Sequence, residues 1–171
     1  QEKLTGVKVY LEHDQLKTDH YNRSLAHVRT KNGEHINLIL VEKGLAFVNL
    51  IPPNLRHADT LISAQKRAEK EKLGIWAYPA YAPFPITQIA NKKTRSWQRF
   101  YGKPISIKRS KKYSRLFFSS NIDVRFENKY LTLFPSLETY LNKTIEVRGW
   151  VSRRNDHYSI SIQHPSAIVI R

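Results

Sequence analysis

The sequence predicts an α+β fold, mainly β with helices, and three observations lead to this prediction. Apolar and polar residues alternate in 7–12 and again in 144–151, which is the period of a half-buried strand. Residues 58–73 instead repeat apolar side chains at helical spacing, and Gly74 follows them as a stop. Short strand-like segments separated by turns fill 94–171, as in a small barrel.

The first part of the chain predicts a meander followed by helices. A tight turn at 31–34 contains Asn32 and Gly33, the residues that hairpin turns favour. Gly44 stands where a helix beginning at Ile36 would need its C-terminal cap. The expected elements are strands at 7–12 and 24–30 and helices at 36–43 and 58–73.

The second part predicts a small closed barrel of the OB type, with one short helix before its fourth strand. Proline residues and a change in charge composition mark the stretch before it as a linker. We therefore expect domains at 1–80 and 94–171, joined by a linker at 81–93. The expected strands are 105–108, 114–119, 123–126, 144–151, 158–163 and 167–170, with the helix at 135–141.

Composition excludes several classes of protein. The 171 residues contain no cysteine, so disulfides, thiolate metal sites and a cysteine nucleophile are ruled out. No apolar run reaches the length of a membrane-spanning helix. Neither a phosphate-binding glycine loop nor a Ser–His–Asp arrangement is evident. Methionine is also absent and the chain starts at Gln1, so we expect a processed or excised piece of a longer protein, with any signal peptide outside it.

Positive charge is concentrated in the second part. The formal net charge is +15, of which +3 falls in 1–80 and +12 in 81–171. The stretch 92–115 contains ten Lys and Arg residues and no acidic residue. Cations interleaved with aromatic residues are the combination that single-stranded nucleic acid prefers. The predicted substrate-binding residues of this stretch are Lys92, Lys93, Arg95, Trp97, Arg99, Lys108, Arg109, Lys111 and Lys112.

Two other interpretations of this basic stretch stay open. It can be a solvated face that keeps the protein soluble. It can also meet an anionic surface, as in a structural or envelope-associated protein. His13, His20 and His27 recur every seven residues, but they lie across strand and turn, so we predict no metal site from them.

Three stretches of the first part carry recognisable motifs: Thr18–Ala26 contains D-x-Y-x-R-x-L-A, Leu40–Ala46 contains L-V-x-x-G-x-A, and Ala68–Trp76 ends in G-x-W. In this order they resemble the signatures of the staphylococcal nuclease (thermonuclease-like) family. The resemblance implies that 1–80 form a partial thermonuclease-like OB barrel, apparently lacking its N-terminal strands. Residues 144–168, with R-G-W, R-N and H-P, resemble a module found behind nuclease-like domains in some bacterial secreted proteins.

The resemblance also implies roles for individual residues. Arg23 would contact the scissile phosphate, and Tyr21 would lie against the nucleotide. The intact parent would hydrolyse phosphodiester bonds of DNA or RNA with calcium, in a secreted or periplasmic location. The family's metal-binding acids lie upstream of the matching portion, and Asp14 and Asp19 are too few for calcium, so no metal ligand is predicted here. The alternative is a catalytically inactive nuclease-like module that binds nucleic acid or another partner. The oligomeric state is not predicted.

Overall fold

The computed structural model describes residues 6–91 and 97–171. The chain divides into two compact units, Gln1–Pro79 and Ala80–Arg171. Both combine strands with helical segments, which confirms the predicted α+β class. None of the described helices is long and apolar enough to cross a membrane. The assignment of 1–80 and 94–171 as functional domains stays a prediction.

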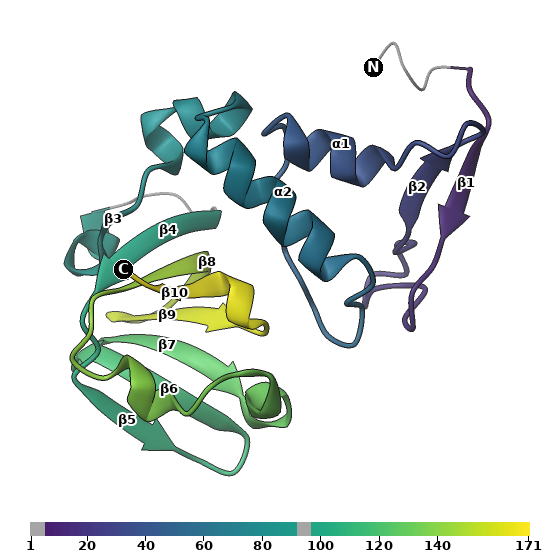
Figure 1. Ribbon diagram of the computed structural model, residues 1–171. Coiled ribbons are helices and arrows are strands. Elements are labelled where there is room, and N and C mark those ends of the chain that lie inside the picture. Colours follow the sequence, from purple (N-terminus) through teal and green to yellow (C-terminus); the bar gives the residue numbers. More distant parts are fainter. Residues whose placement is uncertain (1–5, 92–96) are drawn as a thin grey trace. The chain divides into compact units, whose positions relative to one another are not determined.

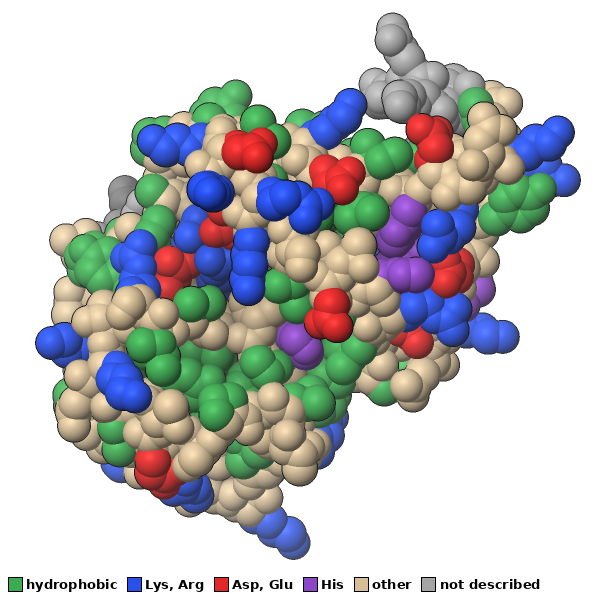
Figure 2. Space-filling view, viewed as in Figure 1, with side chains coloured by type: hydrophobic (Ala, Val, Ile, Leu, Met, Phe, Trp, Pro, Cys, Tyr) green, Lys and Arg blue, Asp and Glu red, His purple; other side chains and the backbone are tan. Residues whose placement is uncertain are grey.

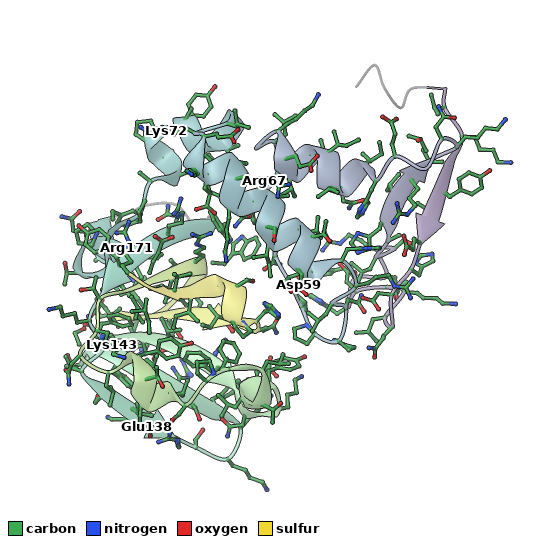
Figure 3. The ribbon with its side chains drawn as sticks, in the orientation of Figure 1. Asp59, Arg67, Lys72, Glu138, Lys143 and Arg171 are labelled. Carbon is green, nitrogen blue, oxygen red and sulfur yellow. The ribbon has the colours of Figure 1, made fainter. Side chains whose placement is uncertain are left out.

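The first unit is built from a strand pair and two helices (Figure 1). Strand β1 (Val9–Glu12) pairs antiparallel with β2 (His27–Thr30), so that Glu12 lies opposite His27. Helix α1 (Ile36–Glu42) packs against α2 (Ala58–Lys70) through Val41, Leu61 and Ala64. Asp59 in the first turn of α2 and Arg67 in its last turn complement the helix dipole (Figure 3).

Two glycines of different signatures meet after the helices. Gly44 and Gly74 both have positive φ, +64° and +52°. The backbone N–H of Ile75 donates to the carbonyl of Gly44 at 2.8 Å. A Cβ added at Gly44 would lie 2.2 Å from the carbonyl oxygen of Leu73. The two signatures therefore contain glycine because two backbone segments touch at this point.

The second unit is mainly one sheet. Its path runs β3-β4-β8-β9-β7-β6-β5, with β10 paired to β8. The β3–β4 and β7–β9 pairs are parallel and the others antiparallel. The strands are β3 (Phe84–Pro85), β4 (Trp97–Gly102), β5 (Ser106–Arg109), β6 (Tyr113–Ser119), β7 (Ile122–Glu127), β8 (Ile145–Arg154), β9 (His157–Ile162) and β10 (Ile168–Ile170). Short 3₁₀ segments η1–η6 span Gly74–Ala77, Pro79–Tyr81, Ile86–Asn91, Asn128–Leu133, Leu137–Tyr140 and Pro165–Ala167.

The core of the second unit lies on one face of this sheet. Alternate residues of β6, β7 and β9 point inward, and Leu116, Val124 and Ile160 are fully buried. Phe134 and Leu137 from η4 and η5 pack onto the same cluster. The opposite face of β6 and β7 carries the half-buried Arg115 and Arg125 together with the buried Asp123, as the alternation places them.

Several sequence predictions need correction. The predicted closed barrel is an open sheet: among the described residues, the strand pairings end at β3 and β5 without joining. Strands β4 and β5 are consecutive in the chain, with only residues 103–105 between them, but they are not neighbours in the sheet. The predicted helix at 135–141 is the 3₁₀ turn Leu137–Tyr140. The predicted linker 81–93 contains β3 and η3, and Ile86 and Ile89 in it belong to the core of the second unit.

Candidate nucleic-acid interface

The turn that presents Arg23 is built by one carboxylate. Oδ1 of Asp19 accepts hydrogen bonds from the backbone N–H groups of Tyr21 at 2.9 Å and Arg23 at 3.0 Å. Asn22 takes a left-handed conformation with φ 61°. Burial raises the pKa of Asp19, but the hydrogen bonds from Arg23 outweigh it and the pKa falls below its usual range. The turn therefore keeps a charged aspartate at neutral pH.

Arg23 and Tyr21 lie side by side on the surface. The Arg23 guanidinium pairs with Oδ2 of Asp19 at 2.6 Å, and its side chain is 74% exposed. Its Cζ lies 5.2 Å from the centre of the Tyr21 ring, which is also exposed. A guanidinium next to an open aromatic face can contact a phosphate and the adjoining nucleotide together. The structure thus brings the two sequence-predicted residues together.

Residues distant in sequence anchor this turn. The Asn54 side chain accepts from the backbone N–H of Leu16 and donates to the carbonyl of Leu16, both at 2.8 Å. Oδ2 of Asp14 accepts from the backbone N–H of Arg56 at 2.7 Å. Sequence reasoning missed Asn54, because nothing local links residues 38 positions apart.

The acidic residues of the turn do not fit a calcium site. Both oxygens of Asp19 bond to residues 21 and 23, and both oxygens of Asp14 accept backbone N–H groups. Calcium takes about six to eight oxygen ligands, several of them carboxylate. Within the residues that the structure describes, no group of three or more His, Cys, Asp or Glu side chains is arranged to hold a metal.

The predicted basic residues fall into different surroundings. Lys92, Lys93 and Arg95 lie outside the described residues. Lys108 and Arg109 lie on β5, Lys111 and Lys112 lie in the turn before β6, and all four are exposed. Arg109 donates to Glu138 at 2.7 Å, and Glu138 lies on η5 (Figure 3). Hydrogen bonds from Ser136 and Arg109 lower the pKa of Glu138 to about 2.

Two predicted binding residues are not on an open surface. Trp97 is 8% exposed, so its ring has little free area for stacking on a base. The side chain of Arg99 is 13% exposed, and its Nε donates to Glu146 at 2.7 Å. Both residues lie on β4, which pairs with β8 inside the sheet. Sequence reasoning named both as binding residues of the basic stretch and predicted no strand at 97–102.

A buried carboxylate organises the face of the sheet opposite the core. Asp123 on β7 is fully buried. It accepts hydrogen bonds from Nη1 of Arg115, Nε2 of His157 and Oγ of Ser159, each at 2.6 Å. A buried charge needs such partners, because removal from water is costly. Sequence reasoning named none of these residues as candidates, although the alternation of β6 and β7 places Arg115 and Asp123 on the outward side.

Histidines of the first unit form a cluster that the sequence did not reveal. His27, His35 and His57 have ring centres 4.9 to 5.0 Å apart, and Nδ1 of His27 lies 3.0 Å from Nε2 of His35. Burial, together with the charge of neighbouring histidines, lowers the pKa of both His27 and His35. Glu12 accepts from Arg29, His57 and Arg56, and these bonds lower its pKa to about 2. Figure 2 shows histidine side chains beside basic and acidic ones on the surface.

Comparison with known proteins agrees with the signatures. Residues 1–78 match the family model described as staphylococcal nuclease homologue. The thermonuclease of Staphylococcus intermedius is 40% identical over 73 residues, and that of Staphylococcus hyicus is 39% identical over 74 residues. Each match covers 43% of this chain, and the chain spans 43% of the length of each relative. These matches support a staphylococcal nuclease-like family for residues 1–78.

Proposed function

We propose that this protein acts on nucleic acid as a member of a nuclease family, by metal-dependent hydrolysis of phosphodiester bonds in DNA or RNA. The observation that carries the proposal is the exposed Arg23–Tyr21 pair on a turn that Asp19 builds. A phosphodiester transition state gains negative charge on its equatorial oxygens, and a preorganised guanidinium stabilises that charge. Calcium enters the proposal through the family alone.

The second unit holds the substrate in this proposal. Lys108, Lys111 and Lys112 are exposed, and within 6–91 and 97–171 no carboxylate forms an ion pair with them. Exposed cations without an ion-pair partner attract a polyanion and release its counterions. Lys92, Lys93 and Arg95 extend the same basic sequence and are proposed as further contacts. A secreted or periplasmic location is proposed from the resemblance of 144–168 to modules of secreted proteins.

The alternative function is a nuclease-like module that binds without cutting. The observation that favours it is the engagement of Asp14 and Asp19 in the turn, because it leaves these carboxylates without a role as metal ligands. On this alternative, Arg23 contributes little, and the cations of the second unit supply the affinity.

The direct test is cleavage by the full-length gene product. DNA and RNA, each in single-stranded and duplex form, are incubated with the protein and calcium, and with the protein and a chelator as control. We expect cleavage with calcium and none with the chelator. Absence of cleavage of every substrate, with binding retained, contradicts the enzymatic proposal and leaves the binding module.

A further inference from the structure

Aromatic rings on the second unit already hold cations of the chain itself. Nζ of Lys112 lies 5.2 Å and Cζ of Arg125 4.9 Å from the centre of the Tyr113 ring. Nζ of Lys108 lies 5.0 Å from the centre of the Phe117 ring. Cations at these distances are attracted by the electron-rich face of the ring. These rings therefore serve to position charge.

The strand residues among these share the face of the sheet opposite the core, and Lys112 lies in the adjoining turn. In the register, Lys108 lies opposite Arg115, and Arg115 lies opposite Arg125, which makes one row across β5, β6 and β7. The neighbouring row places Phe117 opposite Asp123. Directly opposed side chains in a sheet point to the same side. We call the surface made by Lys108, Lys112, Tyr113, Arg115, Phe117 and Arg125 the outer basic face.

The charge on this face is only partly compensated. Asp123 pairs with Arg115, and Glu127 with Lys129 at 3.0 Å. In the described part of the chain, Lys108, Lys112 and Arg125 have no ion pair, and Nε of Arg125 is buried without a hydrogen-bond partner. Like charges opposed across strands destabilise a sheet, so an anion that binds there relieves this repulsion.

We propose that the outer basic face binds the sugar–phosphate backbone of nucleic acid and leaves the bases unread, so that it accepts single strands and duplexes of any sequence. A base that stacked on Tyr113 would have to displace whichever cation, Lys112 or Arg125, lies over that face of the ring, which offsets much of what stacking gains. A phosphate approaches the same cations without displacing anything. This inference rests on the nucleic-acid role proposed for the second unit and names its substrate class.

The test measures, by fluorescence anisotropy, the binding of labelled 20-mers to the full chain in the presence of a chelator. The ligands are a single strand, its duplex, and a strand of the same length with abasic residues in its central half. We expect the abasic strand to bind within about threefold of the normal strand, because stacking contributes little to affinity. A loss of about tenfold or more for the abasic strand overturns the inference while the proposed function stands. Absence of saturable binding to all three ligands overturns both.

Variants separate charge from stacking in the same assay. Lys112→Ala is expected to weaken the binding of all three ligands by the same factor. It should also reduce the slope of log affinity against log salt concentration by about 0.7 for the single strand. Lys143→Ala removes an exposed lysine outside the outer basic face (Figure 3) and is expected to leave the slope unchanged. Tyr113→Phe retains the aromatic ring and is expected to leave the affinity for all three ligands unchanged. Tyr113→Leu, once melting shows that it folds, is expected to weaken normal and abasic strands equally. An unchanged slope for Lys112→Ala, or a Tyr113→Leu loss confined to the normal strand, contradicts the inference.

Discussion

Single residues determine where the charge of Arg23 is presented. Asp19 accepts hydrogen bonds from both the backbone N–H and the guanidinium of Arg23. The Asn54 side chain donates a hydrogen bond to the carbonyl of Leu16 in the preceding segment. The signature alone predicted that Tyr21 and Arg23 are neighbours at the surface, because both lie in one short turn. It did not predict Asn54, whose contact depends on the folded unit.

The contact between Gly44 and Gly74 supplies a prediction at this scale. Gly44→Ala is expected to cost about 1–3 kcal/mol more than Gly33→Ala, because overpacking adds to the strain of a left-handed residue. The added Cβ at Gly44 meets the backbone of Leu73, whereas at Gly33, with φ +83°, nothing lies within 4 Å. Urea denaturation of both variants measures the difference. Equal destabilisation by the two variants would show that the contact is not tight.

The histidine cluster brings together the N-termini of two helices and the start of one strand. His35 is the N-cap of α1, His57 is the N-cap of α2, and His27 begins β2. Sequence periodicity predicted α1, α2 and β2 to within a few residues, because each has its own local pattern. It could not predict the cluster, which depends on how three elements pack. Strand β4 was not predicted, because the buried Gln98 and the mostly covered Arg99 stand among its apolar residues and hide the alternation.

The cluster predicts that the first unit loses stability in mild acid. The pKa values of His27 and His35 are lowered in the folded state, so below about pH 6.5 the unfolded chain binds protons that the folded cluster does not. The stability is present above that pH and is lost as the pH falls. A proton on a helix N-cap also opposes the helix dipole. We expect the midpoint of thermal unfolding to be lower at pH 5.5 than at pH 7.5, by about 3 °C or more.

Circular dichroism of two variants checks the origin of this effect. His35→Gln is expected to reduce the dependence on pH, because it removes one of the imidazoles that resist protonation. His20→Gln, at an exposed histidine outside the cluster, is expected to keep it. A pH dependence that is unchanged in His35→Gln, or reduced equally in both variants, contradicts this assignment.

At the scale of the whole molecule, positive charge and family signatures belong to different units. The signatures and Arg23 fall within Gln1–Pro79, whereas most of the net charge of +15 falls within Ala80–Arg171. Composition predicted this separation, since charge can be counted without a fold. It could not predict which cations are exposed: the Arg99 side chain is only 13% exposed and pairs with Glu146, whereas Lys108 and Lys112 are exposed beside aromatic rings. We therefore propose that phosphate chemistry belongs to the first unit and retention of the polymer to the second.

The most direct test of that division is the effect of Arg23→Ala on turnover compared with affinity. Steady-state cleavage gives kcat, and anisotropy in a chelator gives Kd, for the full-length gene product and its variants. We expect Arg23→Ala to lower kcat by about 100-fold or more and to change Kd by less than about threefold, because its guanidinium acts on charge that develops in the transition state. Lys66→Ala, at an exposed lysine of α2, is the matched control and is expected to change neither quantity. A kcat that Arg23→Ala leaves unchanged, or a loss that falls on Kd instead, contradicts the account.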